Sequence, residues 1–487
     1  MAFGSFLRSA IVAGTFLSFA VPALASPWAE VGDNQLRSDV ELLATAGVID
    51  GITTHWPLPW KSLAARLDGD ALSGQPVAVR LAAERVLRRA QHETMPGISA
   101  SLFVDATNRP SVVYGFDGMG RGEGQAQGSV SFNEGIFSGR ISLGAFTQNF
   151  RGNTTKLMPD GSYLAANLGD TLVYAGYLDH WWGPGEISAL SLSNNARPMP
   201  QIGIERSSTQ ASSWPVLRWL GPWQLEFMLG YLDGPRLQPD TYYNALRLVV
   251  NPLPGLELGI SRTEEFCGQG HNCSPIKDYF HFSNNPFSVN NTNDQLTLDF
   301  KYNRVIGGIP FQVYTQVMDE DYSPIGHPVA SHLFGAGVFL PAGDNPLKLT
   351  AEYTDSVPTV KLFSFGDVLH GAAYNNSGYP DGMRYRGRTL GFSLDSDSTL
   401  LSLQGNWTDP GGRFYQLSIH HAAISNPLNL AGNVVTTAPV HVNMGEARIT
   451  LPWHQFKLDL AGRLQDDQPR PHSGFAAGIE AALRVNL

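Results

Sequence analysis

Apolar and polar side chains alternate along most of the chain, from about Ser99 to Leu487. In the stretch Trp223–Tyr231 every odd position is apolar or aromatic, and the polar residues Gln224 and Glu226 stand between them. Stretches 295–302, 347–353 and 456–460 repeat this pattern. Successive side chains of a β-strand point to opposite faces, so a period of two predicts strands. We expect roughly eighteen to twenty antiparallel strands.

Two all-β architectures are compatible with such alternation. A soluble sandwich hides its apolar faces between two sheets, whereas a membrane barrel turns them to lipid and its polar faces to a water-lined lumen. In a barrel, the charged residues opposite the apolar faces would line the lumen: Glu226, Asp299, Lys301, Lys348, Glu352 and Lys457. Alternation in a single strand does not decide between the two folds, but the expected signal peptide, the aromatic strand ends and the number of strands favour the barrel. We therefore predict an all-β transmembrane barrel over residues 99–487, with Leu225, Leu298 and Leu458 facing lipid.

The stretch 474–487 is predicted to be the last strand, which closes the barrel edge to edge. Counting back from it places the connections 465–473 and 421–440 on the extracellular side. The same count places residues 355–386 on the periplasmic side, where connections are normally short. Either a pair of strands has been missed there or this segment folds into the lumen.

Residues 26–98 follow a helical pattern instead. Asp33 can cap a helix that carries Leu36, Val40 and Leu43 on or near one face. Stretches 60–67 and 77–90 predict two more helices, the second with exposed arginines at Arg80, Arg85, Arg88 and Arg89. We expect a small periplasmic helical segment that lies beside or beneath the barrel.

Residues 1–25 have the features of a cleaved signal peptide. One cation, Arg8, precedes the apolar run 10–17, and Ala23-Leu24-Ala25 fits a signal peptidase site. The apolar run is too short to span a bilayer, which disfavours an uncleaved anchor helix. We expect an exported chain whose mature form begins near Ser26.

Charge and composition narrow the class of partner. The chain has 33 Lys and Arg against 43 Asp and Glu, and this acidic balance argues against nucleic acid, which requires a basic surface. Only 16% of the residues are charged, below the ~25% of an ordinary soluble domain. Glycine and aromatic residues are abundant instead, with 51 Gly, 10 Trp, 16 Tyr and 25 Phe. In an exported chain this composition suits a transmembrane β-barrel. We expect a monomer in the outer membrane of a Gram-negative bacterium, with membrane lipid as one partner.

The most distinctive stretch is Asp170–Arg206, in which a short strand is followed by HWWGPG and then by SNNARP. The two indoles could stack on sugar rings while nearby polar groups bind the hydroxyls. Alternatively, the motif is a turn packed into the lumen or an aromatic anchor at the membrane interface, and Arg197 could equally pair with a lumen carboxylate. The candidate polysaccharide-binding residues of this stretch are Asp179, His180, Trp181, Trp182, Asn194, Asn195 and Arg197.

Several of these motifs resemble one known family. The start SPWAEVGDNQLRSDVELLATAGVIDG, the following WPLPW, and HWWGPG with LSNNARPMP in that order are similar to the Wzi family of capsule-assembly outer-membrane proteins. The resemblance implies a barrel of about eighteen strands with a helical bundle on the periplasmic side. It also implies a lectin-like role in holding or organising capsular polysaccharide. Leu487 departs from the pattern, because outer-membrane barrels usually end in an aromatic residue.

Two further groups of residues carry candidate chemistry. Cys267 and Cys273 are close together in an exported chain, so they predict a short disulfide loop. A metal site that used them with His271 would lack a fourth ligand. Arg384, Tyr385 and Arg386 mix aromatic and cationic groups, which suits contact with an acidic polysaccharide.

The sequence favours binding over catalysis. It contains no Gly-x-Ser-x-Gly elbow, HExxH motif or phosphate-binding glycine loop. His420 and His421 are neighbours on a strand and therefore face opposite ways. We expect no enzyme activity, no cofactor and no metal, and a protein that binds capsular or exopolysaccharide at the cell surface. The alternative is a solute-selective, porin-like channel lined by the inward charges.

Overall fold

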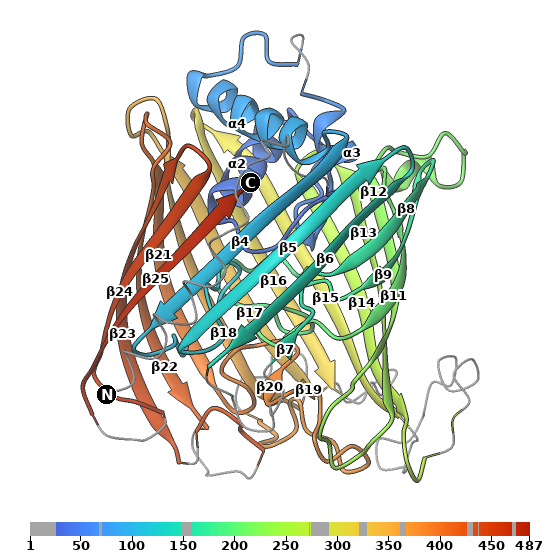
Figure 1. Ribbon diagram of the computed structural model, residues 1–487, viewed down its shortest axis with the longest axis vertical. Helices are drawn as coiled ribbons and strands as arrows, with labels where there is room; N and C mark the ends of the chain where they lie inside the picture. Colours follow the sequence, from blue (N-terminus) through green and yellow to red (C-terminus); the bar gives the residue numbers. More distant parts are fainter. Residues whose placement is uncertain are drawn as a thin grey trace.

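The protein forms a closed antiparallel β-barrel with helices at one end (Figure 1). The computed structural model describes residues 26–67, 71–147, 157–271, 273, 292–320, 329–360, 367–425, 432–436, 438–469 and 474–487. The expected signal peptide, residues 1–25, lies outside them. Within the described residues the wall has 18 strands, together with the two-residue strand β7 (Leu157–Met158), which pairs with Gly144 and Ala145 of β6. We call the two rims of the barrel the helix end and the far end.

Most wall strands are ten or more residues long, but three neighbouring strands are short. The long strands are β4 (Gly97–Thr107), β5 (Gly124–Glu134), β6 (Phe137–Phe146), β12 (Trp223–Tyr231), β13 (Thr241–Leu253), β14 (Leu256–Cys267), β15 (Thr292–Ile306), β16 (Ile309–Glu320), β17 (Ala330–Leu340), β18 (Leu347–Thr359), β21 (Thr399–Thr408), β22 (Phe414–Ile424), β23 (Val440–Trp453), β24 (Phe456–Gln465) and β25 (Ala476–Asn486). The short ones are β8 (Tyr163–Leu168), β9 (Thr171–Gly176) and β11 (Gln201–Arg206). The last strand, β25, pairs with the first, β4, in the register Val485↔Leu102, so the barrel has no free edge.

The outer surface of the wall is apolar, as the alternation predicted. Leu225 is 38% exposed and Leu298 is 50% exposed, and Leu460, on the same face as Leu458, is 38% exposed. In β15 the outward charges Asp294 and Arg304 stand at either side of an apolar row that runs from Leu296 to Tyr302. An apolar band of this kind faces the hydrocarbon of a membrane. The sandwich alternative is therefore excluded.

Aromatic pairs lie at both rims of this apolar band. Near the helix end, the ring centroids of Trp407 and Tyr415 lie 5.6 Å apart. Near the far end, those of Tyr231 and Tyr242 lie 5.2 Å apart. Such girdles sit at the two membrane–water interfaces of outer-membrane barrels. Among the described residues, no helix has the length and apolar character needed to cross a bilayer.

The N-terminal residues form α2 (Asn34–Thr45), α3 (Trp60–Ala64) and α4 (Val77–Glu93), as predicted. The Asp33 side chain caps α2 by accepting a hydrogen bond from the backbone N–H of Leu36 at 3.1 Å. Helix α4 lies across the helix end (Figure 1). Arg85 of α4 was expected to be exposed, but it is partly buried because it pairs with Asp39 of α2 at 2.6 Å.

The position of α2 differs from the prediction of a segment beside or beneath the barrel. Almost all of α2 is buried, and it packs against the inner faces of β15, β16 and β21. Its polar side chains bond to the wall, as in the hydrogen bond from Asn34 to Gln416 at 3.0 Å. Helix α2 therefore fills the lumen at the helix end, where its polar side chains meet those of the wall.

Three further segments fold into the lumen: 108–123, 177–200 and 367–398. The last carries the short hairpin of β19 (Arg384–Tyr385) and β20 (Arg388–Thr389). Since β18 pairs directly with β21, this segment leaves and re-enters the wall at the far end, opposite the helices. The placement of 355–386 at the same end as the helical segment was therefore wrong, and its folding into the lumen was the correct alternative. Two wall strands, β21 and β22, separate this segment from the connection 425–439, so the two connections lie at the same end, and the count was wrong by one strand in this region.

The lipid-facing assignment can be tested with Leu298→Arg. An arginine at the middle of the apolar band should lower the free energy of unfolding by about 2–4 kcal/mol, because the guanidinium would lie in hydrocarbon. Ile306→Arg is the matched control, since Ile306 lies on the same strand beside the helix-end turn, where the cost should be about 0–1 kcal/mol. Urea unfolding in lipid vesicles, followed by tryptophan fluorescence, measures both. Equal losses in the two variants would contradict the membrane depth assigned to Leu298.

Candidate functional site

The stretch singled out in the sequence forms the centre of the lumenal plug. Strands β9 and β11 are neighbours in the wall and pair from Gly176↔Gln201 onward. Residues 177–200 therefore leave and re-enter the wall at the same height and project inward. Within them, β10 (Trp181–Trp182) pairs with β2 (His55–Trp56) of the N-terminal segment. Two parts of the chain that are distant in sequence thus form one plug.

The Gly-Pro-Gly turn has a packing role. A Cβ on Gly183 would lie 2.5 Å from the Gln316 side chain, and one on Gly185 would lie 2.1 Å from the carbonyl oxygen of Ser188. Gly183 also has a φ of +146°, which an L side chain rarely adopts, and the contact of Gly185 is with backbone that cannot move aside. Glycine therefore allows the turn to fold closely on itself at Gly185 and to approach Gln316 of the wall at Gly183.

Trp181 and Trp182 are both completely buried. Trp181 meets Phe116 edge to face at 5.6 Å, and its indole N–H donates to the carbonyl of Gly185 at 2.8 Å. Trp182 lies in the apolar core of the lumen and faces the ring of His55 at 5.6 Å. The pair is therefore a turn packed into the lumen, and the interface-anchor alternative is wrong. A sugar ring would have to displace this packing in order to stack on either indole.

The inward charges predicted to line the lumen do face inward, but most of them bind the plug, whereas Asp299 pairs with Arg247 of the wall. Glu41 of α2 is fully buried and pairs with Lys301 at 2.9 Å and also with Lys348. The Glu352 carboxylate accepts hydrogen bonds from the backbone N–H groups of Glu186 and Ser188, each at 2.7 Å. The wall thus supplies charged side chains that satisfy both the charges and the backbone of the plug.

The other predicted residues of this stretch are held inside the plug. Arg197 pairs with Asp160 at 2.7 Å. This is the alternative in which Arg197 pairs with a carboxylate of the lumen. The Asn195 side chain donates to the carbonyl of Thr389 at 2.9 Å, and that of Asn194 donates to Phe116 at 3.0 Å. Nε2 of His180 lies 3.0 Å from the Glu226 carboxylate. Asp179 is the most accessible of the group, with 33% of its side chain exposed.

Asp179 and Asn194 line a polar cavity of about 540 Å³ that the sequence did not reveal. It runs from the helix-end turns along the inner wall to the plug, and its volume falls within the usual range for ligand pockets. Its charged lining residues come from the plug, the helices and the wall: Arg89, Arg121, Arg140, Lys457, Arg484, Glu30, Asp33, Glu93, Asp160 and Asp179. Arg121 joins the two predicted residues, since it pairs with Asp179 and donates to the carbonyl of Asn194, each at 2.8 Å.

Opposite charges in this cavity compensate each other. Burial by itself would raise the pKa of Asp33, but Lys457 and Arg89 outweigh it and lower that pKa below its usual value. Asp33 therefore stays ionised at neutral pH and serves both as the cap of α2 and as an ion-pair partner of Lys457 at 2.9 Å. The cavity thus presents cations, anions and the rings of Phe103, Tyr114 and Phe456 to whatever enters it.

Arg384, Tyr385 and Arg386 lie away from this cavity, toward the far end. Arg384 is buried and pairs with Asp395 at 2.7 Å, so it holds the segment 367–398 together. Arg386 pairs with Asp233 of the β12–β13 connection at 2.7 Å, and the Asp233 side chain is 37% exposed. The Tyr385 hydroxyl also donates to Asp233. The structure therefore does not bring this group together with the HWWGPG stretch.

Cys267 and Cys273 form the predicted disulfide. His271, between them, takes no part in a metal site with these cysteines, because both sulfurs are in the disulfide. Its ring stacks on Tyr379 at 4.5 Å, and one ring nitrogen lies 3.0 Å from the carbonyl of Gly378. The loop therefore fastens the end of β14 to the segment 367–398.

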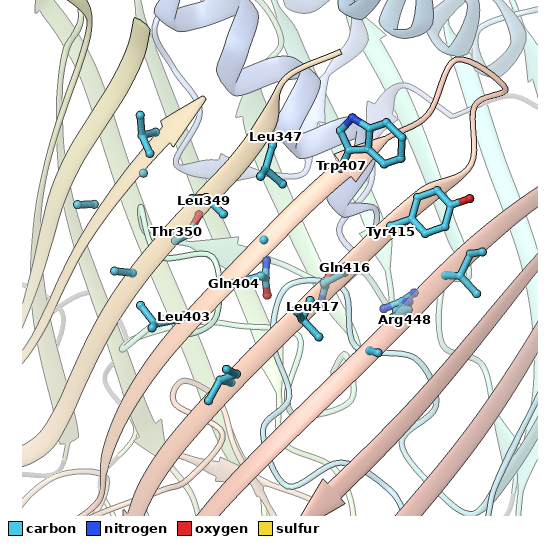
Figure 2. Close-up of a pocket in the computed structure, with 18 of the residues that line it drawn as sticks. Leu347, Leu349, Thr350, Leu403, Gln404, Trp407, Tyr415, Gln416, Leu417 and Arg448 are labelled. Atoms are coloured by element: carbon cyan, nitrogen blue, oxygen red, sulfur yellow. The ribbon is translucent and has the colours of Figure 1, made fainter. Parts of the chain in front are cut away.

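A second, apolar depression of about 1230 Å³ lies on the outer wall (Figure 2). It crosses β16–β18 and β21–β24 and is rimmed by large side chains: Leu347, Leu349, Leu403, Trp407, Tyr415 and Leu417. Small residues such as Gly405 and Gly462 form its floor. The depression belongs to the apolar band. Its surface therefore suits contact with lipid and does not suit a hydrophilic ligand.

The chain is similar to one known protein family. The family model described as capsule assembly protein Wzi matches residues 93–465. The chain belongs to this family. The resemblance seen in the sequence is therefore confirmed, and the apolar band and girdles of this Wzi-family protein place it in the outer membrane.

Two individual proteins illustrate the similarity. An uncharacterized 55.8 kDa protein in the cps region of Klebsiella pneumoniae is 26% identical over 343 residues, which are 68% of this chain and 65% of that protein. The match thus spans just under two thirds of that relative. The solved structure of Wzi from Escherichia coli, described as an outer-membrane protein involved in group 1 capsule assembly and as a carbohydrate-binding β-barrel, has a TM-score of 0.82. It is 19% identical, and the similarity covers 94% of this chain and 98% of that one, so it shows a shared fold.

The buried Glu41 cluster predicts a sharp loss of plug stability in Glu41→Gln. This change removes the carboxylate that pairs with Lys301 and leaves Lys348 with Glu186 alone, and breaking a buried ion pair costs about 3–5 kcal/mol. Proteolysis of the purified Wzi-family protein should then cleave the N-terminal segment faster. Glu84→Gln, at an exposed position of α4, should leave the cleavage rate unchanged. If both variants resist proteolysis equally, the cluster does not hold the plug.

Proposed function

We propose that this protein binds capsular or exopolysaccharide at the cell surface and helps to attach or assemble that layer. The observation that carries the proposal is the combination of Wzi-family membership with a lumen filled by four segments of the protein's own chain. A barrel filled in this way serves as a rigid support in the outer membrane. The description of the Escherichia coli Wzi structure as a carbohydrate-binding barrel agrees with this role.

The filled lumen argues against the porin-like alternative. A conducting pore needs a continuous path of water, whereas the inward charges of this wall are bonded to the plug. Lys301 and Lys348 bind Glu41, and Glu352 binds the backbone of residues 186–188. These same residues would have to line the pore of a solute-selective channel.

We infer that the helix end faces the periplasm. Outer-membrane barrels have short periplasmic turns and longer extracellular connections. Five helix-end connections are two residues long: 135–136, 169–170, 254–255, 307–308 and 454–455. The far end carries the long connections 360–398 and 425–439. The far end is therefore the side that meets extracellular polysaccharide.

The candidate sugar-binding residues accordingly fall into two regions. Arg386 lies toward the far end next to the partly exposed Asp233, where its cation suits an acidic polysaccharide, while the buried Tyr385 donates to Asp233 and holds it in place. Asp179 and Asn194 lie in the polar cavity, which opens toward the helix end. We propose the far-end group as the polysaccharide contact. His180, Trp181, Trp182, Asn195, Arg197 and Arg384 would then act by holding the plug in shape.

Polysaccharide binding by the purified protein tests the function, and Arg386→Gln tests the site. The wild type should bind at least one acidic glycan on an array of bacterial capsular polysaccharides and exopolysaccharides. Losing one charged contact, worth about 1.5–3 kcal/mol, should weaken this binding roughly tenfold or more. Arg80→Gln, on exposed α4, is the matched control. Deleting the gene should also move polysaccharide from the cell-bound to the shed fraction.

The outcomes of this experiment separate function from site. If the wild type binds no glycan and the deletion strain retains its polysaccharide, the proposed function is wrong. If the wild type binds and Arg386→Gln binds equally well, only the far-end contact is wrong. Asp179→Asn would then test the cavity as the contact.

Conductance in planar bilayers gives an independent prediction. The wild-type protein should show almost no single-channel current, because the plug leaves no continuous aqueous path. A general porin measured in the same membrane is the positive control. Stable openings of porin size by the wild type would favour the channel alternative.

A further inference from the structure

Two glutamates of the barrel wall face each other inside the lumen. Glu205 of β11 and Glu226 of β12 are directly paired across adjacent strands, and each is 1% exposed. Two like charges opposite each other on one face of a sheet destabilise it, and burial increases the cost. One of the two carboxylates must therefore carry a proton, or a positive charge must lie nearby.

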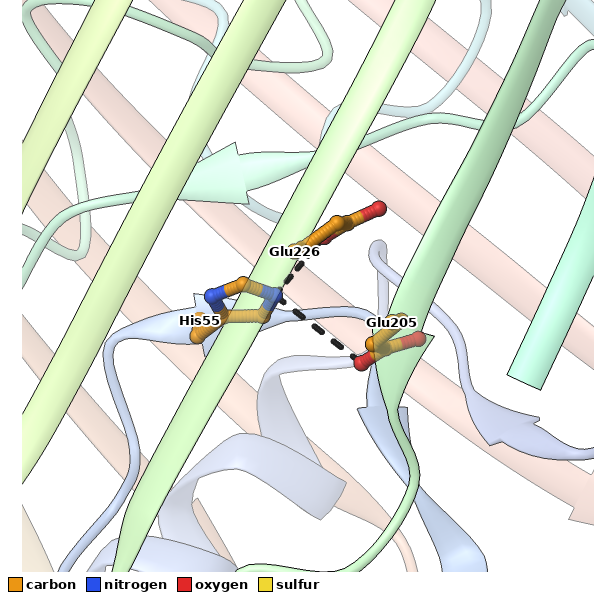
Figure 3. A group of neighbouring side chains, drawn as sticks. All are labelled: His55, Glu205 and Glu226. Carbon is orange, nitrogen blue, oxygen red and sulfur yellow. Dashed lines mark hydrogen bonds and ion pairs between the residues drawn. The ribbon is translucent and has the colours of Figure 1, made fainter. Parts of the chain in front are cut away.

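Two histidines of the plug point at this glutamate pair. Nε2 of His55 lies 2.7 Å from the Glu226 carboxylate and 3.9 Å from that of Glu205, as Figure 3 shows. Nε2 of His180 lies 3.0 Å from the other oxygen of Glu226. Both imidazoles are buried. His55 lies in β2 and His180 directly precedes β10, and these two strands pair. The plug therefore brings the two imidazoles together.

The hydrogen bonds of His180 define which of its nitrogens carries a proton. Nδ1 lies 3.2 Å from the backbone carbonyl of Leu178, an arrangement that requires an N–H on Nδ1. In the neutral ring, Nε2 then has a lone pair that faces a carboxylate oxygen. The Tyr174 hydroxyl does not donate to this lone pair, because it donates to the same Glu226 oxygen at 2.5 Å and lies 3.4 Å from Nε2. A ring nitrogen fixed by a backbone carbonyl, with the other nitrogen directed at further ligands, is the usual arrangement of a metal-binding histidine.

The arginine near this cluster is already paired. The Arg247 guanidinium lies 6.0 Å from the Trp182 ring, but it forms its own ion pair with Asp299 at 2.5 Å. Glu205 is oriented by the indole N–H of Trp28, which donates to its second oxygen at 2.7 Å, and by the amide of Gln224. Nδ1 of His55 is buried without a hydrogen-bond partner among the described residues. Outer hydrogen bonds thus orient the carboxylates, and the charge of the pair remains to be balanced.

We propose that His55, Glu205 and Glu226 hold one divalent transition-metal ion of the zinc class, and that His180, which lies against the other oxygen of Glu226, supplies a fourth ligand when the ion binds. Nε2 of His55 lies 2.7 Å from the Glu226 carboxylate and 3.9 Å from that of Glu205. Two ligand atoms that share a Zn²⁺ ion at ~2.0–2.2 Å lie at most about 4.4 Å apart, so these separations suit one ion. Imidazole with carboxylate favours zinc and its neighbours over magnesium or calcium. The ion would neutralise both glutamates and fasten the two plug segments to the wall.

Metal content of the full-length protein tests this site. The protein should carry a Strep-tag in place of a polyhistidine tag, and be purified from zinc-replete cells without chelator. Elemental analysis should then find about one Zn²⁺ per chain after dialysis. Glu226→Gln and His180→Asn should lose it, with affinity reduced beyond the ~10–100-fold that follows loss of an outer hydrogen bond. His454→Asn is the matched control, since His454 is exposed in a helix-end turn with a left-handed backbone that asparagine accepts.

A second measurement needs no variant and therefore does not depend on variant folding. Wild-type protein is unfolded in urea with chelator, then refolded in detergent with Co²⁺ or with no metal. One bound Co²⁺ should give visible absorption bands of a nitrogen–oxygen site, and the metal-loaded protein should unfold at higher urea. Absence of zinc in the purified protein together with no Co²⁺ spectrum after refolding would overturn the proposal. The His180–Glu226 contact would then be an imidazolium–carboxylate pair.

Discussion

The structure depends on the pairing of buried charges between the barrel wall and the plug. Glu41 of α2 binds Lys301 and Lys348 of the wall, and Lys348 also binds Glu186 of the segment 177–200. All four groups are almost completely buried. A single charge left unpaired in such a place would cost several kcal/mol, so the wall and the plug are stable only together.

The same dependence extends to the backbone of the plug. Irregular backbone at membrane depth is tolerated only where its polar groups are satisfied by protein or water. Glu257 accepts the N–H groups of Thr53 and Thr54 at 2.9 Å each, and Glu352 does the same for residues 186–188. The inward glutamates of the wall therefore serve as acceptors for chain that has no secondary structure of its own. These acceptors allow four separate segments to occupy the lumen although much of their backbone lies outside helices and strands.

In a barrel filled in this way, the outer wall and the rims have different roles. The apolar band holds the protein in the membrane, and the described plug segments occupy the lumen that a channel would keep open. What remains for recognition is the chain exposed at the rims and the polar cavity next to α2. Because Arg386 and Asp233 are fixed to the plug and the β12–β13 connection, a ligand at the far end would meet preorganised groups, which limits the entropy lost on binding.

The sequence by itself determined the barrel, since a period of two with charges on one face and apolar residues on the other is a local property of each strand. It also determined the three helices, from the Asp33 cap and the apolar spacing, and the Cys267–Cys273 disulfide. The family followed from HWWGPG and SNNARP. Tertiary structure alone decided that α2 enters the lumen, that Trp181 and Trp182 are packed inside, and that residues 367–398 return from the far end. Those outcomes depend on partners such as Lys301, Glu352 and Glu226, which lie far away in sequence. The alternation shows that these side chains face inward, and only the closed barrel shows which part of the chain they meet.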